Sequence, residues 1–146
     1  MSSIPLQRSK KLLEQDGWSV DKCEYWNQWS GQRRDLFHLA DLAAIHENFI
    51  GTTYIQCCGE DLQEHVRKVM EGYEVKSGKH KGEIIPPNPH LYKLLKAQNK
   101  FLIWGWRLRK HEGTKDTWQL REIEFLIKDG VVSAYENKTE LEKEPK

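Results

Sequence analysis

The residues with the clearest chemical potential lie in the stretch LADLAAIHENFIGTTYIQCCG, residues 39–59. Asp41 interrupts an apolar run, and Gln56 stands in a β-rich segment that follows it. A buried carboxylate is costly unless it is paired or binds a cation. If the two segments are neighbouring strands, both side-chain oxygens would lie on one face and form the minimum scaffold for a hard cation such as Mg²⁺. The alternative is an ion pair between Asp41 and Arg33 or Arg34 that stabilises the start of a strand.

The three cysteines raise a second question of chemistry. Cys23, Cys57 and Cys58 are odd in number, and two of them are adjacent in sequence, which favours a reducing, cytoplasmic compartment over a disulfide framework. Neither a Cys-x-x-Cys nor a His-x-x-x-His spacing is present, so a zinc site is not expected. We do not expect thiol catalysis either, because no histidine stands at a telling position relative to the cysteines.

The elements that must position these residues follow from hydrophobic periodicity and turn signals. The pattern predicts a helix over 5–15, strands over 18–26, 39–45 and 52–58, a helix from 60 or 61 to about 70, a loop over 76–89, a helix over 91–99, and strands over 101–108 and 117–127. This order indicates an α/β fold with a mixed central β-sheet flanked by helices. One domain over 1–136 and a charged, flexible tail over 137–146 are expected. No apolar run approaches the ~20 residues of a membrane span, and residues 1–15 do not resemble a signal peptide.

Charge is distributed unevenly along the chain. The net charge is +1, yet residues 65–111 contain 11 Lys and Arg against 3 acidic residues. Such segregation attracts polyanions, although a solvated basic face without a ligand is the plain alternative. The candidate phosphate contacts are Arg67, Lys68, Lys76, Lys79, Lys81, Arg107 and Arg109. Trp104 and Trp106 share one face of a predicted strand, where they could stack on bases or, as we prefer, cover the sheet beneath a helix.

Five motifs occur in order between residues 31 and 125: GQRRDLFHLADLAAI, YIQCCG, HVRKV, FLIWGWRLRK and WQLREIEF. Their order resembles a small group of phage and bacterial proteins within the PD-(D/E)XK nuclease superfamily, on the Holliday-junction-resolvase-like side. The resemblance implies a restriction-endonuclease-like core. It also implies hydrolysis of DNA phosphodiesters with Mg²⁺ or Mn²⁺. Because resolvase-like proteins often act as dimers, a homodimer is an expected assembly.

The same resemblance assigns candidate metal ligands. In that superfamily the first acid lies on the second core strand, and an acid-x-Lys motif lies on the third. Asp41 matches the first acid, whereas Gln56 and Cys58 replace the second acid and the lysine. Gln56 could still bind a cation through its amide oxygen, and the backbone carbonyl of Cys57 could add a ligand. The lower charge should reduce the affinity for metal.

Further site residues are also implied by the resemblance. Lys68 could serve as a migrated catalytic lysine, and Glu14 resembles an extra acid that some members carry on the first helix; ordinary surface roles are the alternatives for both. Arg33 and Arg34, within the first motif, are further candidates for DNA contact. Loss of the second acid and the lysine also fits a catalytically degenerate protein that binds nucleic acid or a protein partner. A purely structural phage accessory protein is a third hypothesis.

Overall fold

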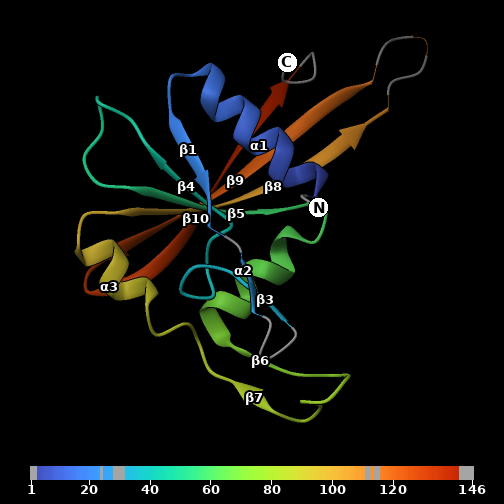
Figure 1. Ribbon diagram of the computed structural model, residues 1–146, viewed down its shortest axis with the longest axis vertical. Helices are drawn as coiled ribbons and strands as arrows, with labels where there is room; N and C mark the ends of the chain where they lie inside the picture. The colour runs from blue at the N-terminus through green and yellow to red at the C-terminus, as the bar shows by residue number, and fades with distance from the viewer. Residues whose placement is uncertain (1–2, 24, 28–31, 111–112, 114–115, 142–146) are drawn as a thin grey trace.

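The computed structural model describes residues 3–23, 25–27, 32–110, 113 and 116–141 (Figure 1). In chain order the elements are α1 (Ile4–Gln15), β1 (Ser19–Lys22), β2 (Tyr25–Asn27), β3 (Gln32–Arg34), β4 (Leu42–Ile45), β5 (Thr53–Cys58), α2 (Leu62–Glu71), β6 (Tyr73–Glu74), β7 (Ile84–Ile85), α3 (Leu91–Lys96), β8 (Lys100–Arg109), β9 (Thr117–Lys128) and β10 (Val131–Leu141). None of the helices in these ranges has the length and apolar character needed to cross a bilayer.

The main sheet has six strands in the order β1-β4-β5-β8-β9-β10. Two antiparallel three-stranded units, β1-β4-β5 and β8-β9-β10, are joined by parallel pairing of β5 with β8. Parallel neighbours require a long crossover connection, and here that connection contains α2 and α3. The predicted mixed sheet flanked by helices is therefore confirmed.

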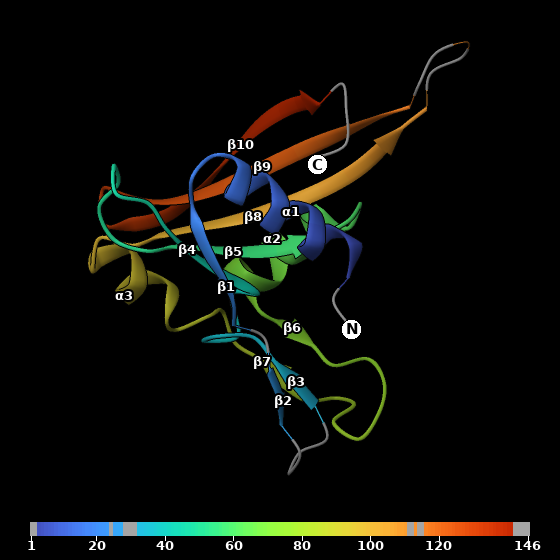
Figure 2. The same ribbon diagram turned by 45° about the horizontal axis from the view of Figure 1, so that its top comes forward.

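Helices cover both faces of this sheet (Figures 1 and 2). On one face, Leu6 and Leu13 of α1 pack in a buried cluster that also contains Ile55 of β5 and Trp106 of β8. On the other face, α2 and α3 pack against a second cluster centred on Phe101 of β8. The three layers bury each helix along one apolar face, as an amphipathic helix requires.

The first helix shows how local signals specify an element. Ser3 is the N-cap, and its hydroxyl accepts a hydrogen bond from the Leu6 N–H at 3.3 Å. Gly17, with φ of +89°, follows the helix in a backbone conformation that favours glycine. Leu6, Ser9 and Leu13 are the buried positions of α1, and their spacing of three and four residues defines the face that meets the sheet.

The two tryptophans of β8 lie beneath α1. Trp104 and Trp106 are buried, and their indole N–H groups donate to Glu122 Oε2 at 2.9 Å and to Ser9 Oγ at 2.8 Å. A buried indole normally has such a partner. The preferred interpretation, that this pair covers the sheet, therefore holds, and the pair is not a base-stacking platform.

Several predicted boundaries differ from the structure. The segment 18–26 divides into β1 and β2, and the segment 39–45 becomes a strand only from Leu42. The loop predicted over 76–89 contains β7, which pairs with β6. β10 continues to Leu141, so the charged segment assigned to the tail begins as strand. β10 is an edge strand of the main sheet. Such a strand is held by backbone pairing and does not need apolar side chains, so the polar sequence of β10 did not indicate a strand. Residues 142–146 lie outside the described part.

Candidate functional site

Asp41 immediately precedes β4. The antiparallel strand β5 continues past the first residue of β4, so its last residues lie beside Asp41. The residue is only 8% exposed. Its N–H donates to the Ile55 carbonyl at 2.9 Å, and its carbonyl accepts the Cys23 N–H at 2.8 Å. Its Oδ2 accepts the Cys57 N–H at 2.8 Å. The carboxylate thus continues the β4–β5 ladder beyond the start of β4, and this bond helps to stabilise a buried acid here.

The prediction that Asp41 sits within a strand is therefore wrong by one position, because the ladder between β4 and β5 begins at Leu42. The prediction that its segment neighbours residues 52–58 is confirmed. The register pairs Leu42 with Ile55, so Asp41 lies beside Gln56 and Cys57 of β5. The Asp41 carboxylate accepts a main-chain N–H, and such groups point along the sheet rather than out of its faces.

Gln56 carries a buried oxygen that lacks a partner. Its Oε1 is shielded from solvent, and within the described ranges it accepts no hydrogen bond. A buried polar atom in this state costs about 1–3 kcal/mol. Such atoms are rare in folded proteins, and an unseen ion or water is one of the usual reasons for them. Gln56 Oε1 is therefore a candidate ligand oxygen.

The backbone carbonyl of Cys57 points to the side of β5 on which Asp41 lies. In a strand, the N–H and C=O of one residue point to the same side, and the Cys57 N–H points to the Asp41 carboxylate. Asp41, Gln56 and Cys57 therefore offer one carboxylate, one amide oxygen and one main-chain carbonyl at neighbouring positions in sequence and register. All three are hard oxygen donors of the kind Mg²⁺ and Mn²⁺ accept. Because only one of them is charged, this donor set fits weak binding of a divalent cation.

The cysteine thiols near this site stay protonated at neutral pH. Burial is the largest cause in each case, and nearby carboxylates including Asp41 add to it. The pKa of Cys23 is raised to about 11, that of Cys58 is raised to about 12, and that of Cys57 is raised further still. A neutral thiol is a poor nucleophile.

Lys68 and Glu14 lie away from Asp41. The Lys68 ammonium lies 5.0 Å from the centroid of the Tyr73 ring, just beyond the C-terminal end of α2. Glu14 is exposed in the last turn of α1. That turn leads into β1, whose first residue, Ser19, pairs with Ile45 at the far end of β4 from Asp41. The structure does not bring either residue to the Asp41 carboxylate.

The basic residues of segment 65–111 form no single surface. Arg67 is paired with Glu64 on α2, and Lys76 with Glu74 at 2.6 Å. The turn that carries Lys79 and Lys81 extends from the β6–β7 pair, whereas Arg107 and Arg109 lie near the far end of β8. Both views place these two regions at opposite ends of the molecule (Figures 1 and 2). Arg33 and Arg34 lie in β3, but their side chains lie outside the described part.

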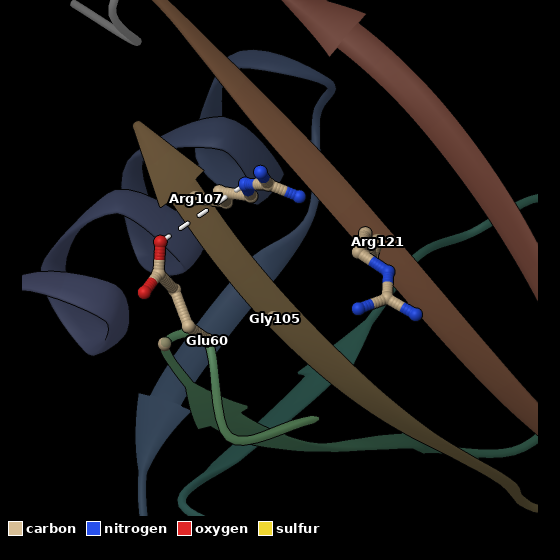
Figure 3. Close-up of a pocket in the computed structure, with 5 residues that line it drawn as sticks. Glu60, Gly105, Arg107 and Arg121 are labelled. Atoms are coloured by element: carbon tan, nitrogen blue, oxygen red, sulfur yellow. Dashed lines mark ion pairs between the residues drawn. The ribbon is translucent and has the colours of Figure 1, made fainter. Parts of the chain in front are cut away.

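A pocket of about 230 Å³ opens where β5 ends. Its lining residues are Gly59, Glu60, Gly105, Arg107 and Arg121 (Figure 3). Arg107 Nε lies 4.0 Å from Glu60 Oε1. Arg121 donates two hydrogen bonds to Glu136, at 3.0 and 2.8 Å. A Cβ at Gly105 would lie 3.1 Å from the Gly59 carbonyl and from Leu62 Cβ. Glycine therefore allows α2 to begin against β8.

The structure also brings together three side chains that sequence reasoning missed. The ligand atoms of Cys58, Asp61 and His65 all lie within 4.8 Å of one another, so the cluster could hold a metal ion. These residues span the end of β5 and the first turns of α2. The spacing Cys-x-x-Asp-x-x-x-His is the signal in the sequence. It mixes three ligand types, so the like-ligand spacings Cys-x-x-Cys and His-x-x-x-His do not contain it.

Comparison of this chain with protein-family models, curated proteins and solved structures gave no match.

Proposed function

We propose that this protein is a divalent-metal-dependent DNA phosphodiesterase whose ligands are the Asp41 carboxylate, the Gln56 amide oxygen and the Cys57 carbonyl. The observation that carries the proposal is the buried Gln56 Oε1, which has no hydrogen-bond partner among the described residues. Gln56 lies on β5, the strand whose Cys57 N–H bonds to the buried Asp41 carboxylate. A restriction-endonuclease-like core is part of the same proposal. It is supported by Asp41, which immediately precedes the second strand of the main sheet, and by Gln56, which lies in the third.

Each residue would have a separate task. Asp41 provides the negative charge, and its bond to the Cys57 N–H fixes the orientation of its carboxylate. Gln56 adds a neutral oxygen held by burial rather than by charge. A bound Mg²⁺ or Mn²⁺ would polarise the scissile phosphate and lower the pKa of a water molecule. Cys58 stands where the resemblance implies a lysine, and its thiol is neutral. General acid–base assistance contributes about 10²–10⁴-fold to catalysis, so we expect slow hydrolysis.

The test is cleavage of labelled duplex, flap and four-way-junction DNA with Mg²⁺ or Mn²⁺. Asp41→Asn should abolish cleavage while keeping the fold. Gln56→Glu should restore the charge of the usual motif, so cleavage should reach half its maximum at a lower metal concentration. Glu47→Gln is the matched control, because it removes an exposed carboxylate from the turn between β4 and β5. Cleavage by Asp41→Asn at the wild-type rate would refute the proposed site.

A second candidate is a catalytically degenerate protein that binds DNA or a protein partner. It is favoured by the same neutral Gln56 and Cys58. This candidate predicts metal-independent DNA binding that weakens steeply with salt, because Lys and Arg release counterions from phosphates. Reversal of charge at Arg107 and Arg109 should weaken binding to all sequences alike. Binding without cleavage under every metal and DNA structure would favour this candidate. The mass of the particle in solution would test the homodimer that the resemblance implies.

A further inference from the structure

The cluster of Cys58, Asp61 and His65 lies at the junction of a strand and a helix. Cys58 is the last residue of β5 and is 5% exposed. Asp61 occupies the N-cap position of α2, and His65 lies one turn further along the same helix. The side chains of Asp61 and His65 are 63% and 27% exposed. The sulfur therefore forms the buried side of the cluster, and the carboxylate and imidazole form its open side.

The distances within the cluster are close to those of a tetrahedral metal site. Zinc bonds of about 2.0–2.3 Å place tetrahedral ligands roughly 3.3–3.6 Å apart. Here the three ligand atoms all lie within 4.8 Å of one another, and His65 Nε2 lies 3.0 Å from Asp61 Oδ2. The Asp61 and His65 side chains are the more exposed members of the cluster, so rotation of these two side chains would bring their ligand atoms closer to the Cys58 sulfur.

Asp61 is also not used as a helix cap. An aspartate at the N-cap usually accepts a hydrogen bond from the first turn of its helix. Within the described ranges the Asp61 carboxylate makes no capping bond, and it contacts His65 instead. Its oxygens therefore remain directed to the cluster rather than to the backbone of α2.

The charges of the surroundings are compatible with a dication. A Cys58 thiolate and the Asp61 carboxylate together carry the two negative charges that balance one divalent ion. Arg121 is the cation that acts electrostatically on Cys58. Its guanidinium is held by Glu136 through two hydrogen bonds, so its charge is largely compensated.

We propose that Cys58, Asp61 and His65 form a site for Zn²⁺ that is separate from the oxygen ligands around Asp41. One thiolate, one imidazole and one carboxylate suit zinc and do not suit Mg²⁺. On binding, the Cys58 S–H bond is replaced by a Zn–S bond, and the proton passes to solvent. Three protein ligands leave the fourth position to water or an anion. The ion also ties the end of β5 to the first turns of α2.

The experiment uses Co²⁺ as a spectroscopic probe of the full-length protein, followed by displacement with Zn²⁺. We expect one thiolate-bound Co²⁺ per chain, a thiolate-to-cobalt charge-transfer band in the near ultraviolet, and its loss when Zn²⁺ is added. Cys58→Ser should abolish the band. His65→Gln and Asp61→Asn alter partly exposed side chains and preserve the fold. Each should weaken Zn²⁺ binding at least about 10-fold, because even residues behind the ligands contribute 10–100-fold to affinity.

Two control variants test the neighbouring thiol and one other histidine. Cys57→Ser should leave the charge-transfer band intact, because the side chains of adjacent strand residues point to opposite faces. His80→Gln removes a histidine that pairs with Glu83 at 3.2 Å without any cysteine, and it should leave Zn²⁺ affinity unchanged. Absence of the band in wild type, its persistence in Cys58→Ser, or equal affinity in His65→Gln would each overturn the proposal. None of these readouts depends on DNA cleavage.

Discussion

Asp41→Ala and Asp41→Asn should separate the structural role of this carboxylate from the metal-binding role proposed for it. The Cys57 N–H lies at the end of β5, and its acceptor is Asp41 Oδ2 at 2.8 Å. Alanine leaves that N–H without an acceptor, whereas asparagine keeps a side-chain oxygen but removes the charge. The two variants therefore differ in hydrogen bonding and share the loss of the charged ligand.

The expected effect of alanine follows from this one contact. An unsatisfied buried donor costs about 1–3 kcal/mol. In a chain of this size each kcal/mol shifts the melting temperature by roughly 3 °C, so Asp41→Ala should melt roughly 3–9 °C below wild type. Asp41→Asn should melt clearly above the alanine variant, yet lose metal-dependent cleavage just as completely.

Thermal and urea unfolding followed by circular dichroism, together with the cleavage assay, measure both effects on the same preparations. Glu47→Gln, which removes an exposed carboxylate, should match wild type in both. If alanine and asparagine destabilise the protein equally, the hydrogen bond to Cys57 does not account for the burial of Asp41. If alanine has no effect on stability, the structural role assigned to the carboxylate is refuted.

Three further predictions concern the core. Ser9→Ala leaves the buried Trp106 N–H without an acceptor and should reduce the free energy of unfolding by about 1–3 kcal/mol; a loss below about 0.5 kcal/mol in urea titration would contradict this. Gly105→Ala places a Cβ 3.1 Å from the start of α2 and should destabilise by about 1–3 kcal/mol, so an unchanged urea midpoint would show that α2 shifts easily. The raised pKa values of Cys23 and Cys58, about 11 and about 12, keep both thiols protonated in the folded state at pH values where the unfolded chain loses these protons. Stability should therefore fall as pH rises above about 8.5, less steeply in Cys23→Ser, and a flat profile to pH 10 would refute this linkage.

Elements with strong local signals were predictable from the sequence. The cap at Ser3 and the glycine at 17 specify α1, and the apolar run of β8 identifies a buried strand. In each case the local preference agrees with the tertiary environment, which is why the prediction succeeded.

The candidate site was predictable only in part. Strand assignment brought Asp41 near Gln56, but the exact start of β4 depends on a side-chain hydrogen bond to the neighbouring strand, and no local propensity encodes that bond. The cluster around Cys58 crosses from a strand to a helix, so neither periodicity places its three residues together. β10 was not among the predicted strands, because it is stabilised by pairing with β9 and its own polar sequence gives no strong strand signal.

The order of strands in the main sheet has a consequence for how the chain folds. Within each three-stranded unit, every strand pairs with the preceding sheet strand, so most of these contacts are local and form early. The parallel pairing of β5 with β8 joins Thr53 to Lys100 and requires closure of the whole intervening segment, which carries the larger entropic cost. We expect this docking step to limit the folding rate, with two β-meanders formed before they meet. The oxygens around Asp41 and the thiol of Cys58 lie in the first meander. We therefore expect these candidate ligands to be in place before β5 pairs with β8.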